Sequence, residues 1–164
     1  MDALKLLKQD HEKLKRLLAL LDETGESAPK KRQNLFAKAK RELTMHEILE
    51  EELVYPAFEK QAKLKEIVLE GYEEHHVVDM VFGELSKISP EDESWGAKLS
   101  VAKENIEHHI EEEEGEMFKQ ARKIFDEKEL EKLGFQLAAR KEELEKETPS
   151  DLEETRDDVR EEAA

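Results

Sequence analysis

The sequence predicts an all-α protein, an antiparallel up-down-up-down four-helix bundle with an additional C-terminal helix. Apolar residues recur at alternating spacings of three and four, which is the repeat of one helix face. Six glycines and four prolines are spread over 164 residues, and the segments between them are long enough for helices. With 43% charged and 37% hydrophobic residues, the composition suits amphipathic helices that have narrow apolar stripes and long solvated faces.

Four long helices are expected over residues 2–22, 31–58, 64–88 and 94–125, and the short connections between them favour antiparallel neighbours. Asp126 followed by Glu129 predicts a capping box that opens a fifth helix, ending near residue 147. Residues 1–147 are therefore expected to form one domain. Residues 148–164 are expected to be a flexible acidic tail, because they are rich in charge and poor in large aliphatic side chains.

Charge and composition exclude several classes of function. The formal net charge of −16 gives a field that repels nucleic acid and anionic lipid, so neither is an expected partner. The chain has no apolar run of the roughly 20 residues that a membrane span needs and no apolar signal-peptide core, which predicts a cytoplasmic protein. The absence of cysteine removes disulfides, iron–sulfur clusters and thiolate zinc sites, leaving imidazole and carboxylate as strong metal ligands.

All six histidines fall at four places, one on each expected bundle helix. These places are His11, His46, the pair His75-His76 and the pair His108-His109. The segments HEILEEELVYP (46–56) and HIEEEEGEMFK (109–119) superpose, and each begins a His-x-x-x-Glu pattern. The interval from the first histidine to the second nearly equals the interval from the third to the fourth, so the chain is interpreted as a duplicated helix pair.

Residues four apart lie on one helix face, so each His-x-x-x-Glu can direct an imidazole and a carboxylate inward. Two metal ions roughly 3.5–4 Å apart could each take two imidazoles while both carboxylates bridge. The candidate ligands are His11, His46, Glu50, His75, His109 and Glu113. Mixed ligands with open positions favour iron or manganese over a closed zinc site. Because neutral imidazole is the ligand form, affinity is expected to fall as pH drops through about 6.5.

Other polar residues near these positions are expected to lie outside the site. His75 is preferred over His76 because it shares an apolar stripe, and His108 belongs to a solvated face. The remaining glutamates around the two motifs are expected to face solvent: Glu47, Glu51, Glu52, Glu111, Glu112, Glu114 and Glu116. Aromatic residues are expected to close the core near the site, namely Tyr55, Phe58, Phe82 and Phe118. A redox or gating role for Tyr55 or Tyr72 is the less favoured alternative.

At these residues the sequence resembles the hemerythrin-like, or HHE cation-binding, family. The resemblance is carried by DHEKLKRLL, HEILEEELVYP, EEHHVVDMVF and HIEEEEGEMF, and covers roughly residues 4–125. It implies two iron ions bridged by oxo or hydroxo and held by the six candidate ligands, with manganese or zinc less favoured. It also implies an activity among oxygen binding, nitric oxide handling, peroxide decomposition and iron sensing, without choosing one.

One departure from the family pattern bears on the chemistry. In the oxygen-carrying members the third helix supplies a second histidine one turn after the first, whereas this chain has Asp79 four residues after His75. The resemblance therefore argues against oxygen carriage and favours peroxide decomposition. Asp79 is expected to bind a metal weakly or to orient His75.

Three functions remain open at this point. The leading hypothesis is a non-haem di-iron protein that binds or reacts with oxygen, peroxide or nitric oxide. The alternative is an iron or oxygen sensor, or an iron-binding module, that acts through a protein partner by its fifth helix or acidic tail. The third is a helical interaction module whose histidines are incidental.

Overall fold

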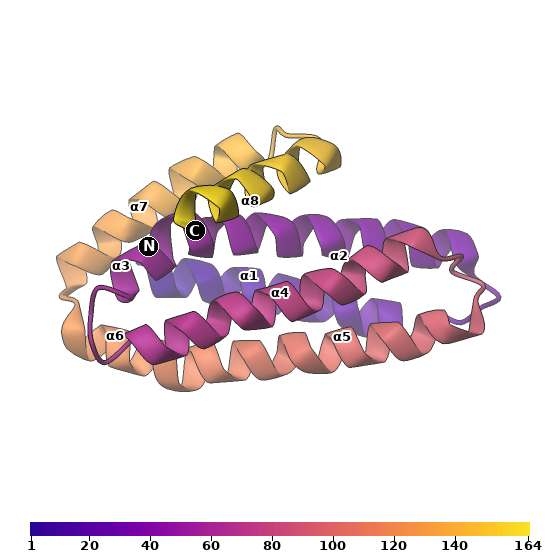
Figure 1. The fold of residues 1–164 in the computed structure, drawn as a ribbon, viewed down its shortest axis with the longest axis horizontal. Coiled ribbons are helices and arrows are strands. Elements are labelled where there is room, and N and C mark those ends of the chain that lie inside the picture. The colour runs from indigo at the N-terminus through magenta and orange to yellow at the C-terminus, as the bar shows by residue number, and fades with distance from the viewer.

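The computed structural model describes residues 1–164, and all of its regular structure is helical, which confirms the predicted all-α class (Figure 1). The four long helices are α1 (Ala3–Asp22), α2 (Pro29–Leu49), α4 (Lys65–Lys87) and α5 (Glu93–Glu112). The others are η1 (Glu50–Val54), α3 (Tyr55–Phe58), η2 (Glu113–Met117), α6 (Phe118–Ile124), α7 (Glu127–Leu144) and α8 (Pro149–Ala163). None of the helices combines the length and the hydropathy that a membrane span requires.

The second and fourth long segments each contain a short π-helical stretch that periodicity did not predict. Helix α2 continues through η1 into α3, and α5 continues through η2 into α6, and the π-helical stretches begin at Glu50 and Glu113. Both copies change geometry at the same point, although only the first has a proline nearby, Pro56. The proline is therefore not the cause. Short π-helical segments inside α-helices are frequent at functional sites.

The long helices bury two apolar clusters, one on each side of the histidines. Helix α1 packs against α2 and α5, and α4 packs against α5. On α1, Leu7 belongs to the first cluster and Leu14 to the second, and His11 lies between them. His46 likewise lies between Leu43 and Leu49. The polar residues of the site are thus enclosed between two layers of buried apolar side chains.

Helix α7 covers α1 and also contacts α2. It begins with the predicted capping box, in which the backbone N–H of Glu129 donates to Asp126 and the Glu129 side chain accepts from the Asp126 backbone. Gly134 allows close packing against the N-terminus, because a Cβ at that position would lie 2.3 Å from the Met1 carbonyl oxygen.

The structure differs from the sequence expectation at residues 148–164. Instead of a flexible tail, Pro149–Ala163 form helix α8, which is capped by Thr148 and packs against α2 (Figure 1). One buried leucine, Leu152, anchors it, and ion pairs such as Lys40 to Glu153 hold it in place. The count of aliphatic residues missed this helix because charged side chains supply most of its attachment. Helices α7 and α8 therefore both lie outside the four long helical segments, where the sequence predicted one additional helix.

Candidate metal centre

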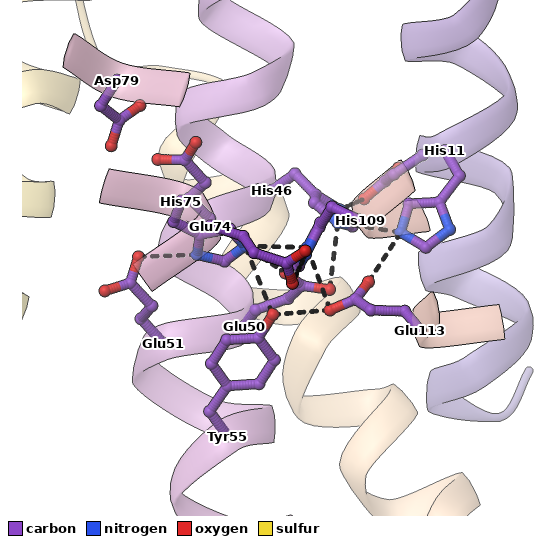
Figure 2. A network of polar contacts seen from close by, with 12 residues as sticks. His11, His46, Glu50, Glu51, Tyr55, Glu74, His75, Asp79, His109 and Glu113 are labelled. Atoms are coloured by element: carbon purple, nitrogen blue, oxygen red, sulfur yellow. Dashed lines mark hydrogen bonds and ion pairs between the residues drawn. The ribbon is translucent and has the colours of Figure 1, made fainter. Parts of the chain in front are cut away.

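The six predicted ligand side chains converge between the two apolar clusters (Figure 2). They are each 6% exposed or less: His11, His46, Glu50, His75, His109 and Glu113. The two exposed histidines, His76 and His108, lie outside this convergence, as expected. Two groups of four potential ligands form, and they share both glutamates.

The first group, called site A, consists of His11, His46, Glu50 and Glu113. His11 Nε2 lies 3.1 Å from His46 Nε2 and 3.1 Å from Glu113 Oε2. His46 Nε2 lies 3.1 Å from Glu50 Oε1. Two imidazole nitrogens and one oxygen from each carboxylate therefore face one another.

The second group, called site B, consists of Glu50, His75, His109 and Glu113. His75 Nε2 lies 3.2 Å from His109 Nε2 and 3.0 Å from Glu50 Oε2. His109 Nε2 lies 3.3 Å from Glu113 Oε1. Each carboxylate thus presents one oxygen to site A and the other to site B, which is the arrangement of a bridging ligand.

These donors fit metal cations. Both oxygens of Glu50 and Oε2 of Glu113 are buried and accept no hydrogen bond within the protein. Burying a carboxylate costs several kcal/mol unless a positive charge compensates it, and without metal only the neighbouring imidazoles can supply that charge. A cation at site A and another at site B would be contacted by all of these oxygens and by four imidazole nitrogens.

Each imidazole turns Nε2 toward the site and Nδ1 toward a carboxylate outside it. The Nδ1 to oxygen distances are 2.8 Å for His11 and Glu114, 3.0 Å for His75 and Glu51, 2.9 Å for His109 and Glu74, and 3.6 Å for His46 and Asp10. Such outer carboxylates select the tautomer and the ring orientation of a metal-binding histidine. The imidazoles of His11, His75 and His109 are therefore oriented before any ion arrives, whereas His46 Nδ1 makes no hydrogen bond.

The outer carboxylates follow the duplication, yet sequence reasoning missed them. Asp10 and Glu74 directly precede the first histidine of each half, while Glu51 and Glu114 directly follow each shared glutamate. The expectation that Glu51 and Glu47 face solvent is wrong, since they are 4% and 0% exposed. These acidic residues recur at the same positions in both halves, and this repeat could have predicted that they contact the candidate ligand histidines.

Tyr55 breaks the twofold likeness of the two sites. Its hydroxyl donates a hydrogen bond to Glu113 Oε1 at 2.6 Å and lies 3.3 Å from His75 Nε2. Its ring stacks on His75 with centroids 5.4 Å apart, whereas Phe118 stacks on His11 in the other half at 6.0 Å. Site B therefore has a buried phenol, and site A has an apolar ring at the corresponding position.

Burial and neighbouring charge determine the protonation states of the site in the absence of metal. Burial alone would lower the pKa of His46, but the Glu50 carboxylate and Asp10 raise it to about 10. Burial and Glu50 would raise the pKa of Glu113, but His109 and His11 lower it to about 2. Imidazolium protons therefore neutralise the shared carboxylates, and metal ions must displace them.

Asp79 lies outside both sites (Figure 2). Its carboxylate pairs with Arg160 at 2.7 Å and with Arg156 at 3.5 Å, both from α8. The expectation that Asp79 binds a metal or orients His75 is therefore wrong. Glu51 contacts His75 instead, because the side chain four residues after His75 points toward α8.

A void of about 10 Å³ adjoins the imidazoles, which is about the space for one water molecule. Apolar side chains close much of it, among them Leu14, Leu43, Val78 and Ile106. The space beside the site is thus too small for an organic substrate without rearrangement.

The comparisons with known proteins agree with this geometry. The family model of the hemerythrin HHE cation binding domain matches residues 2–121. The chain is also similar to the crystal structure of a hemerythrin HHE cation binding domain-containing protein from Mycobacterium kansasii. That similarity has a TM-score of 0.78 and 26% identity, and it covers 88% of this chain and 87% of that one. A comparison with curated proteins gave no match. The buried His/Glu cluster and the family match over most of the chain together show that this protein belongs to the hemerythrin HHE cation-binding domain family.

Proposed function

We propose that sites A and B each hold an iron ion and that the protein is a non-haem di-iron protein that binds or reacts with a small oxidant. The observation that carries this proposal is the division of Glu50 and Glu113 between the two sites, with two imidazoles completing each. Mixed nitrogen and oxygen ligands with open positions favour iron over a closed zinc site. Bound iron would supply Lewis acidity and one-electron redox chemistry.

We propose that four helical segments form an up-down-up-down bundle. The first is α1, the second is α2 together with η1 and α3, the third is α4, and the fourth is α5 together with η2 and α6. Helices α7 and α8 lie outside it. This arrangement explains why each of the four segments contributes one histidine to the convergence.

The surroundings of the site limit the reactant to a small molecule. The adjoining void of about 10 Å³ suits oxygen, peroxide or nitric oxide and excludes larger substrates. Its lining is mixed, with apolar side chains such as Leu14 and Ile106 beside the four imidazoles, Glu47 and Glu74. The protein's contribution here is to select the reactant by size.

Tyr55 supplies a proton donor at site B. Burial raises the pKa of the Tyr55 phenol well above its ordinary value, and the carboxylates of Glu113 and Glu50 raise it further. The hydroxyl therefore keeps its proton at neutral pH and holds it against Glu113 Oε1. A reactant that gains negative charge beside site B would find this O–H in reach.

Four imidazoles rather than five face the site, which favours peroxide decomposition over reversible oxygen carriage. Asp79 occupies the place of a possible fifth imidazole, and Arg160 holds its carboxylate away from the site. We therefore expect peroxide to be consumed faster than oxygen is reversibly stored.

Metal analysis of protein from iron-replete cells tests the proposal. We expect about two irons per chain, near-ultraviolet absorption from the iron pair, and reaction of the reduced protein in stopped-flow mixing with oxygen, peroxide or nitric oxide. Glu113→Ala should lose iron because it removes a shared carboxylate, whereas His108→Ala, at an exposed position, should keep it. The proposal would be contradicted if the purified protein contains no iron and does not bind ferrous iron when it is added.

One observation favours a second function, an iron or oxygen sensor that a protein partner reads through α8. Arg160 of α8 binds Glu51, which contacts His75, so the state of the site and the position of α8 are physically linked. Trypsin cleavage after Arg156 and Arg160 should then be slower in the metal-loaded full-length protein than in the metal-free protein. Equal cleavage rates would count against a sensor of this kind.

A further inference from the structure

Arg160 connects α8 to three carboxylates, one each from α2, η1 and α4. Its Nη2 lies 2.9 Å from Glu51 Oε2, 3.0 Å from Glu47 Oε2 and 2.7 Å from Asp79 Oδ2. Its Nε lies 3.1 Å from Glu51 Oε1, so the guanidinium grips both oxygens of Glu51. A two-pronged contact of this type fixes both the position and the direction of a carboxylate.

Glu51, whose carboxylate binds Arg160, also orients the imidazole of His75. Glu51 Oε2 accepts a hydrogen bond from His75 Nδ1 at 3.0 Å, which leaves Nε2 directed at site B, 3.0 Å from Glu50 Oε2. A continuous chain of contacts therefore runs from Arg160 through Glu51 and His75 into site B.

The second half of the duplication has no arginine bound to the corresponding carboxylate. Glu114 is the counterpart of Glu51 and contacts His11 Nδ1 at 2.8 Å, but its side chain is 26% exposed and binds no arginine. The Glu51 side chain is 4% exposed. In site A, the carboxylate that contacts His11 Nδ1 therefore faces solvent. In site B, the carboxylate that contacts His75 Nδ1 is buried and bound by Arg160.

We propose that Arg160 is a positioning residue for site B, which sets the metal affinity of that site through Glu51 and His75 and leaves site A unchanged. The inference rests on the proposed function, because it requires that sites A and B bind metal ions. The residue lies beyond residues 2–121, the part of the chain that the family model matches. A helix outside the matched domain thus completes one of its two metal positions.

A purely structural role for α8 is the competing explanation, and Arg156 separates the two. Arg156 lies one turn before Arg160 on the same helix and pairs with Asp79 at 3.5 Å, but it does not contact Glu51. Loss of its charge should loosen α8 in a similar way without releasing the carboxylate behind His75.

The test is a Co²⁺ titration of the metal-free full-length protein, followed by visible absorption and by proton NMR of the imidazole N–H groups. Arg160→Met should weaken one of two bound ions by roughly 10- to 100-fold, the usual effect of losing an outer partner of a ligand. It should also shift one of four imidazole N–H signals and speed its exchange with solvent. Arg160→Lys should restore part of the affinity, and Arg156→Met should behave as wild type.

Each outcome decides between the ideas. If wild-type protein binds two ions and Arg160→Met weakens neither or both equally, or if Arg156→Met has the same effect, the inference is overturned and the proposed function stands. If wild-type protein does not bind two ions, both fail. Should Arg160→Met lose its helical circular dichroism, Glu51→Gln replaces it, and retention of both affinities in that variant overturns the inference.

Discussion

Replacing Gly71 with alanine tests whether Tyr55 is held rigidly at the site. A Cβ at position 71 would lie 2.7 Å from Tyr55 Oη, closer than such atoms approach in proteins, and 3.0 Å from its Cζ. The ring cannot move aside easily, because it is fully buried, stacks on His75 and donates to Glu113. Inserting a methyl group into a packed core typically costs about 1–3 kcal/mol.

Gly83 provides a matched control on the same helix, since a Cβ there would meet nothing within 4 Å. Gly→Ala within a helix gains roughly 0.5–1 kcal/mol from backbone entropy, and this gain is common to both positions. We therefore expect Gly83→Ala to stabilise the metal-free protein and Gly71→Ala to be less stable than it by about 1–3 kcal/mol. Urea unfolding followed by helical circular dichroism measures the difference.

The outcome that would refute this reasoning is a Gly71→Ala variant as stable as Gly83→Ala. Tyr55 would then be free to shift, and its hydrogen bond to Glu113 would not be a fixed part of the site. A second variant narrows the cause, because adding Tyr55→Phe to Gly71→Ala removes the 2.7 Å contact while keeping the ring. Because both substitutions act on the same contact, the double variant should lose less stability than the sum of the losses of the two single variants.

Three further predictions follow from the same contacts. Because the pKa of His46 is raised to about 10 from 6.5, its stabilisation of the metal-free protein is complete below pH 6.5 and is lost as pH rises through about 10. Metal displaces these protons, so the Tm difference between metal-loaded and metal-free protein should widen over that range, and a narrowing difference would contradict this reasoning. Tyr55→Phe leaves a buried carboxylate oxygen without its donor and should destabilise the metal-free protein by about 1–3 kcal/mol in urea unfolding, whereas the half-buried control Tyr72→Phe should change little. Gly134→Ala would place a Cβ 2.3 Å from the N-terminal backbone and should lower Tm, whereas Gly115→Ala, with nothing within 4 Å, should not; equal Tm values would show that the N-terminus moves freely.

The pattern of residues along the chain was sufficient to predict the four long helical segments, helix α7 and the six side chains that converge. Residues four apart share a helix face, so His46 with Glu50 and His109 with Glu113 had to point together wherever their helices packed. The apolar stripe likewise distinguished buried His75 from exposed His76. These conclusions depend on spacing within one helix, which is local information.

Only the tertiary structure determined which carboxylates contact the Nδ1 atoms of the candidate ligand histidines. Glu51 reaches His75 and Glu114 reaches His11 across helices that are distant in sequence, and helical spacing carries no information about such a partner. The pKa of His46 also rises, from the ordinary value of 6.5 to about 10, because the nearby carboxylate of Glu50 and that of Asp10 from helix α1 both act on its imidazole.

Helix α8 shows the same division most clearly. By composition, residues 148–164 hold too few apolar side chains to pack, and the sequence therefore predicted a flexible tail. In the fold, Glu47, Glu51 and Asp79 come together from two helices, and their combined negative charge binds Arg160. A charge of this kind exists only after the helices have packed, so the sequence was enough to identify the candidate ligands, while the packed structure determined how their side chains are held.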